Sequence, residues 1–174
     1  KNRTIIMDLF EWTDDPAEAD AMGDTKEAMF RDTVESEGMS VLPGVGALLD
    51  DLKANQVACV VGSSAPLANI LCVLDRLGFR EHFRAILSAE DVTQGKPHPE
   101  VFLKAAEAAG FPPSQCLVIE DAVVGVEAAL AAGAAVLAVT TTREAVDLHM
   151  AHRVAASLES FTTADLESIV RTRG

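Results

Sequence analysis

Short apolar blocks alternate with longer amphipathic segments along most of the chain. The blocks cover residues 57–61, 85–87, 116–119 and 135–139 and are continuous, which is typical of strands buried on both faces of a parallel sheet. The segments between them place apolar residues three and four positions apart, as in helices with one buried face. The pattern predicts a three-layer α/β/α sandwich, because each parallel crossover must pass over one face of the sheet.

The first 40 residues follow a different pattern. Residues 5–10 suit a short amphipathic helix, and Asp14-Asp15-Pro16 ends it. The acidic stretch 14–24 contains few large apolar residues and is predicted to be a mobile loop, followed by a second helix that contains residues 28–34. A domain boundary is placed near residues 38–43. At the other end of the chain, a final helix is expected at about 163–171.

Composition narrows the class of protein and its partners. The chain has 174 residues, 49% of them hydrophobic, which is enough for one substantial core. Its net charge of −13 disfavours nucleic acid and anionic membranes as main partners. No apolar run approaches the length of a membrane span, and the first residues lack the features of a secretory signal, so a soluble, cytoplasmic protein is expected. The three scattered cysteines are interpreted as reduced core residues.

Three polar clusters follow directly on predicted strands. Ser63-Ser64 follows the first strand, Lys96 lies in the loop after the second, and Glu120-Asp121 follows the third. In an open parallel sheet these positions converge on one edge. Each cluster alone has a structural explanation, since Ser64 and Glu120-Asp121 could cap helices and Lys96 could be solvated. Together they provide a hydroxyl and a lysine for a phosphoryl group, and carboxylates for Mg2+.

These clusters lie in segments that resemble a known family. Residues 60–64 (Val-Val-Gly-Ser-Ser), 95–102 (Gly-Lys-Pro-His-Pro-Glu-Val-Phe) and 118–125 (Val-Ile-Glu-Asp-Ala-Val-Val-Gly) resemble the second, third and fourth motifs of the haloacid dehalogenase (HAD) superfamily. The pattern is most similar to the branch of β-phosphoglucomutase and the small sugar-phosphate phosphatases. The resemblance implies that residues 41–174 form a Rossmann-like HAD core and that residues 1–40 are part of a helical cap.

The resemblance also implies residue roles for a small phosphorylated metabolite, in particular a sugar phosphate, as substrate. Ser63, with Ser64, would bind phosphoryl oxygens, and Lys96 would neutralise charge on the nucleophile and the phosphoryl group. Asp121 would bind Mg2+ directly, with Glu120 as a ligand or an outer contact. Arg3 could bind a distal anionic group of the substrate, or could simply be a basic helix start.

The first motif of the family, an apolar strand that carries the aspartate nucleophile and a second aspartate, has no clear counterpart. The nearest segment, residues 5–13, contains Asp8 but has Phe10 at the position of the second aspartate. We therefore expect residues 1–40 to be the second half of the cap, and the nucleophile to lie upstream of Lys1.

That first strand belongs in the middle of the sheet, so a chain without it should contain a gap and unpaired backbone groups. The chain as given is expected to be inactive without that segment. The hypotheses are a phosphatase that forms a phosphoaspartate, a phosphomutase of the β-phosphoglucomutase type, and a catalytically dead HAD-like binding module.

Overall fold

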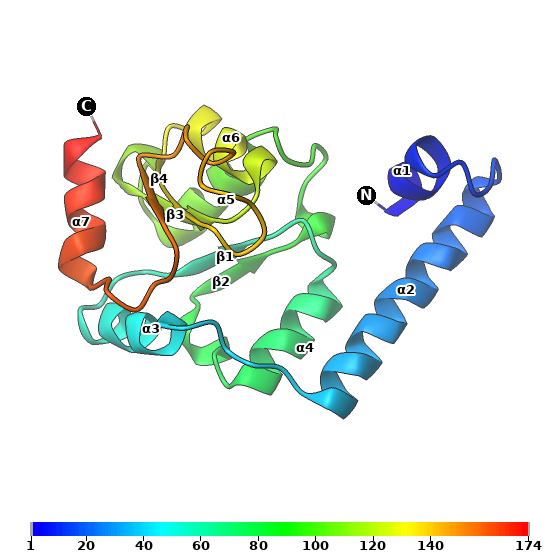
Figure 1. Cartoon of the computed structure of the whole chain (residues 1–174), viewed down its shortest axis with the longest axis horizontal. Coiled ribbons are helices and arrows are strands. Elements are labelled where there is room, and N and C mark those ends of the chain that lie inside the picture. The colour runs from blue at the N-terminus through cyan, green and yellow to red at the C-terminus, as the bar shows by residue number, and fades with distance from the viewer. Residues whose placement is uncertain (1, 174) are drawn as a thin grey trace.

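The computed structural model describes residues 2–173. Five short strands alternate with helices along the chain (Figure 1). The strands are β1 Val60–Gly62, β2 Ala85–Leu87, β3 Leu117–Glu120, β4 Ala135–Val139 and β5 Arg153–Ala155. The main helices are α2 Pro16–Glu37, α3 Val45–Ala54, α4 Leu67–Leu77, α5 Glu100–Ala109, α6 Val123–Ala131 and α7 Thr163–Thr172.

The strands form two parallel sheets. In one, β1 pairs with β2, with Val61 opposite Ile86; in the other, β3 pairs with β4, and β4 with β5. The predicted α/β class with parallel strands is confirmed. The sequence did not predict β5, because its three residues begin with an exposed arginine and make no apolar block.

Strand β4 lies at the centre of the core, and all five of its residues are buried. Val136 and Ala138 pack in a cluster with residues of α5 and α6. Leu137 and Val139 pack in a second cluster with residues of α3 and α7. Successive side chains of a strand point to opposite faces, so this alternation confirms the three layers.

The N-terminal segment is more helical than predicted. The chain begins with α1 (Asn2–Thr4), which continues into a π-helix at Ile5–Leu9 and is followed by the long helix α2 (Figure 1). The predicted mobile loop at residues 14–24 is wrong. Asp15 caps α2 by accepting from the backbone N–H of Ala17 at 2.8 Å, and Pro16 occupies the first helical position, which needs no amide donor.

The helical state of residues 5–9 also shows that the alternative in which residues 5–13 form the first strand is wrong. Helix α2 ends at Glu37, so the predicted boundary near residues 38–43 falls between α2 and α3. Within residues 2–173, no helix combines the length and apolar character needed to cross a bilayer.

Candidate active site

The side chain of Lys96 contacts the carboxyl ends of two strands, β1 and β3. Its Nζ lies 3.4 Å from the carbonyl oxygen of Gly62 at the end of β1, and it forms an ion pair with Glu120 at the end of β3. The Lys96 and Glu120 side chains are only 12% and 9% exposed, and Nζ lies 4.6 Å from the ring centroid of Phe102. The loop after β2 therefore meets the carboxyl ends of β1 and β3, as the sequence predicted.

The carboxylate of Glu120 is fully engaged. One oxygen pairs with Lys96, and the other accepts from the backbone N–H groups of Asp121 at 2.9 Å and Ala122 at 3.1 Å. These amides directly precede α6, where a negative charge is favourable. Glu120 thus fixes both the lysine and the start of the helix.

Gly125 makes room for this carboxylate. A Cβ at position 125 would lie 2.1 Å from Cδ of Glu120 and 2.2 and 2.4 Å from its two oxygens. Glycine is therefore required here by the side chain of Glu120, which packs against α6.

Asp121 is held at the same edge by the loop after β4. One of its carboxylate oxygens accepts from the hydroxyl of Thr141 at 3.0 Å, and Thr142 donates to its backbone carbonyl at 2.9 Å. No helix follows these threonines directly, so they do not serve as helix N-caps.

These side chains could form only part of a magnesium site. Among residues 2–173, His, Cys, Asp and Glu form no group of three or more that could hold a metal ion. Glu120 has both oxygens occupied, so Asp121 offers the available hard oxygen. Mg2+ is commonly held by one or two carboxylates together with water and phosphate oxygens. The donor set fits this ion, provided that a further oxygen ligand comes from outside these residues or from the substrate.

Ser63 and Ser64 directly follow β1 and line a cavity of about 940 Å3. Ser63 is fixed by its own backbone, since its N–H donates to Leu87 at 2.9 Å and its hydroxyl accepts from the N–H of Ala65 at 3.1 Å. Ser64 does not cap the next helix, which was one expectation. Helix α4 begins after Pro66, and both carboxylate oxygens of Glu90 accept from the N–H of Leu67.

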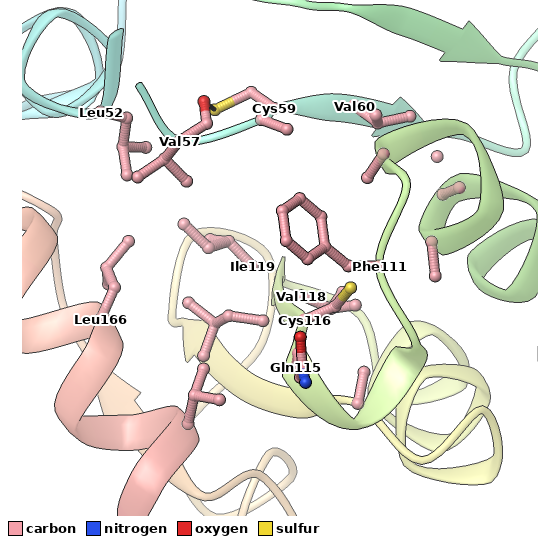
Figure 2. Close-up of a pocket in the computed structure, with 18 of the residues that line it drawn as sticks. Leu52, Val57, Cys59, Val60, Phe111, Gln115, Cys116, Val118, Ile119 and Leu166 are labelled. Carbon is pink, nitrogen blue, oxygen red and sulfur yellow. Dashed lines mark hydrogen bonds between the residues drawn. The ribbon is translucent and has the colours of Figure 1, made fainter. Parts of the chain in front are cut away.

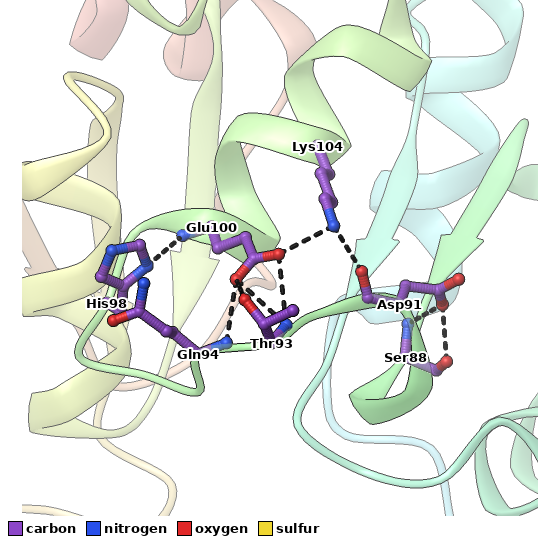
Figure 3. Close-up of polar contacts among 7 residues, drawn as sticks. All are labelled: Ser88, Asp91, Thr93, Gln94, His98, Glu100 and Lys104. Carbon is purple, nitrogen blue, oxygen red and sulfur yellow. Dashed lines mark hydrogen bonds and ion pairs between the residues drawn. The ribbon is translucent and has the colours of Figure 1, made fainter.

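A carboxylate that the sequence did not single out holds the lysine loop. Glu100 accepts from the backbone N–H of Gln94 at 2.9 Å, from the N–H and hydroxyl of Thr93, and from Lys104 at 2.8 Å (Figure 3). Lys104 and then these loop donors lower the pKa of Glu100 to about 2. Glu100 therefore ties the first turn of α5 to the residues before Lys96, which fixes both ends of the loop.

Polar groups from α1, α2 and α4 line the far wall of the same cavity. The carboxylate of Glu27 accepts from Asn2 at 2.6 Å, from Lys26 at 2.6 Å and from Asn69 of the core helix α4. Burial acts to raise the pKa of Glu27, but these hydrogen bonds outweigh it and lower the pKa. Glu27 thus connects α2 to the core at the cavity wall.

Arg3 is not among the residues that line this cavity. It forms an ion pair with Asp20 of α2, and both side chains are about half exposed. The structure thus joins Lys96 to Glu120 and to Gly62, the residue before Ser63, and leaves Arg3 apart. The sequence did not single out Glu27 or Glu100, because acidic residues inside helices give no signal of their partners; the one available signal was that Glu100 lies within the lysine motif at residues 95–102.

Comparison with known proteins shows that the sequence of this chain is similar to those of hydrolases. Residues 4–133 match a family model described as haloacid dehalogenase-like hydrolase. Hexitol phosphatase A from Escherichia coli is 35% identical over 162 residues, which cover 92% of this chain and 74% of that protein. A haloacid dehalogenase-like hydrolase domain-containing protein from Arabidopsis thaliana is 31% identical, and the match covers 88% of this chain and half of the plant protein.

Solved structures show the same fold. A HAD hydrolase from Entamoeba histolytica superposes with a TM-score of 0.89 at 20% identity, over 99% of this chain and 79% of that chain. A β-phosphoglucomutase from Clostridium difficile superposes with a TM-score of 0.74 at 27% identity, over 89% of this chain and 66% of that chain.

Proposed function

Because the chain belongs to the haloacid dehalogenase-like hydrolase family, we propose that the complete protein is a Mg2+-dependent phosphatase for a small phosphorylated metabolite, in particular a sugar phosphate. The observation that carries this proposal is the position of Lys96. It is held by Gly62 and Glu120 at the ends of β1 and β3, and Ser63, which lines the cavity, directly follows Gly62. An ammonium group has three donors, so one remains for a phosphoryl oxygen.

The proposed reaction has two steps. An aspartate, expected upstream of Lys1, attacks phosphorus; the bond from phosphorus to the substrate oxygen breaks, and that oxygen takes a proton from a second acid. Water then attacks the phosphoaspartate, releasing phosphate and the free carboxylate. In both steps Ser63 donates to a phosphoryl oxygen, and Lys96 balances negative charge. Asp121 would hold Mg2+, with Glu120 outside it, and the bound ion would neutralise charge on the phosphoryl group.

The sugar-phosphate specificity is supported by two relatives and by the cavity wall. Hexitol phosphatase A and the β-phosphoglucomutase of Bacillus subtilis, which is 38% identical over 93 residues, are both named for phosphorylated sugars or sugar alcohols. The amide of Asn69, the ammonium of Lys26 and the carboxylate of Glu27 would bind hydroxyl groups of such a substrate. Arg3 would reach a distal anion only after release from Asp20. A phosphomutase is the second candidate, and a cytoplasmic location is part of the same proposal.

The test is phosphate release from a panel of hexitol and hexose phosphates by the full-length protein with Mg2+. We expect Lys96→Ala and Asp121→Asn to lower kcat by about a hundredfold or more, and a metal chelator to abolish turnover. Lys53→Ala, on the distant helix α3, is the matched control and should leave kcat unchanged. Turnover that survives both site substitutions would refute the assignment. Conversion to an isomeric sugar phosphate without phosphate release would identify a mutase, and absence of any turnover would favour the binding module.

A further inference from the structure

The carboxylate of Asp121 is separate from the apolar cavity between the two sheets. That cavity, of about 660 Å3, has Val60, Val118 and Ile119 among its lining residues (Figure 2). Neither Asp121 nor Thr141 belongs to the described residues that line it. The orientation of the Asp121 carboxylate is therefore set by its polar neighbours and not by the apolar side chains around this cavity.

The backbone of Asp121 is fixed from two sides. Its N–H donates to Glu120 at 2.9 Å, and its carbonyl accepts from the hydroxyl of Thr142 at 2.9 Å. The freedom that remains is rotation of the carboxylate, and in aspartate this torsion is broad and roughly two-fold. A contact to one carboxylate oxygen is then enough to decide how the group is oriented.

Thr141 supplies that contact. Its hydroxyl donates to Oδ2 of Asp121 at 3.0 Å. Among the side-chain hydrogen bonds of residues 2–173, no other donor reaches this carboxylate. Oδ1 is therefore the oxygen that Asp121 can offer to a cation.

The backbone of the loop after β4 holds Thr141 in place. The N–H of Thr141 donates to the carbonyl of Val139 at 2.9 Å, and the N–H of Thr140 donates to Ala155 of β5 at 3.0 Å. Further along the same loop, Leu148 is completely buried in the cluster that includes residues of α5 and α6. A hydroxyl on a fixed backbone loses little further freedom when it binds, so it can orient a neighbouring carboxylate.

Mg2+ and Ca2+ differ in how they use a carboxylate with one engaged oxygen. Mg2+ demands near-octahedral geometry and keeps several waters, whereas Ca2+ accepts more ligands and binds carboxylates through one oxygen or through both. Asp121 can offer one oxygen while Thr141 engages the other, which suits Mg2+. Binding through both oxygens would require loss of the Thr141 hydrogen bond.

We propose that Thr141 is a positioning residue that makes the cation site at Asp121 selective for Mg2+ over Ca2+. The inference rests on the proposed function for the assignment of the cation to Asp121. Groups that orient a metal ligand typically contribute ten- to a hundredfold in metal affinity. Loss of the Thr141 hydroxyl should therefore weaken Mg2+ binding by about tenfold or more. Ca2+ binding should weaken much less, because Ca2+ can use the oxygen that is released.

The test is Mn2+ binding to the full-length protein, followed by electron paramagnetic resonance, with Mg2+ and Ca2+ as competitors and no substrate. The part of the binding that Asp121→Asn removes is assigned to the site. Thr141→Val, which is nearly isosteric, should lower the ratio of Mg2+ to Ca2+ affinity by about tenfold. Thr141→Ser keeps the hydroxyl and should restore the wild-type ratio.

Thr172→Val in α7 is the matched control. Its hydroxyl also makes one hydrogen bond, to a carbonyl within α7 at 2.9 Å. The residue next to it, Arg173, contacts the carbonyl of Gly133, which precedes β4 at the end of the strand opposite to Thr141. The affinity ratio of this variant should equal that of the wild type. Thr141 is exposed, so the urea midpoint of Thr141→Val should also stay close to that of the wild type.

Three results would overturn the proposal. They are an unchanged affinity ratio in Thr141→Val, a loss in Thr141→Ser as large as that in Thr141→Val, and no cation binding that depends on Asp121. Failure of the proposed function is a different result, because a protein that binds Mg2+ at Asp121 but releases no phosphate from any substrate would lose the phosphatase assignment alone. A protein that releases phosphate and keeps its affinity ratio in Thr141→Val would lose only the role of Thr141.

Discussion

Replacing Gly125 by alanine is expected to displace Glu120 and to release Lys96. The new Cβ would lie 2.1 Å from Cδ of Glu120, far inside van der Waals contact. The carboxylate is the end of a flexible side chain, so it moves more easily than the helix. When it moves, it loses the backbone N–H groups of Asp121 and Ala122 as well as its ion pair with Lys96.

The magnitude follows from these contacts. Hydrogen bonds to a charged group contribute about 1.5–3 kcal/mol each, and part of this is regained when water reaches the released groups. A loss of about 2–4 kcal/mol in the free energy of unfolding is therefore expected. Alanine in place of glycine in a helix returns up to about 1 kcal/mol. The net destabilisation should be about 1–3 kcal/mol.

Urea unfolding followed by circular dichroism measures this change as a lower midpoint at constant slope. The matched control is Gly46→Ala in α3, where the new Cβ would make an ordinary contact of 3.5 Å with Phe79; it should be neutral or slightly stabilising. In a Glu120→Ala background the clash is gone, so Gly125→Ala should no longer destabilise. Equal stability of the two single glycine variants, or an undiminished cost in the Glu120→Ala background, would refute the reasoning.

Two further predictions concern the lysine loop and the entry to α3. The pKa of Glu100 is lowered to about 2, so its contribution to stability is complete above pH 4.5 and is lost as the pH falls towards 2. The stability difference between wild type and Glu100→Gln in urea should therefore shrink over that interval, and a constant difference would contradict the clamp. Gly44→Ala should cost at least about 2 kcal/mol, because φ is +85° and the Cβ would lie 2.3 Å from the backbone of Glu159. Gly78→Ala is the control, because φ is +72° there but no atom lies within 4 Å of the new Cβ; it should cost about 1 kcal/mol in the same urea assay. Equal costs at the two positions would contradict the predicted clash of Gly44→Ala with Glu159.

Local patterns accounted for the parts of the fold that depend on near neighbours. The strands at residues 85–87 and 135–139 were predicted with the bounds that the structure has, because each is a continuous apolar block. Gly78 and Gly110 end α4 and α5 in the left-handed conformation, which glycine adopts at little cost. The loop predicted at the acidic start of α2 is wrong, because the cap that Asp15 and Pro16 provide outweighs the acidic composition of this stretch.

The sequence by itself determined the α/β class, the order of the elements and the polar residues that follow three strands. These features depend on periodicity and on the direction of parallel strands, both of which are local. Only the tertiary structure decided what each polar group contacts: Glu120 with Lys96, Asp121 with Thr141, and Glu27 with Asn69. Those partners lie 20 to 42 positions apart, and packing of separate elements brings them together.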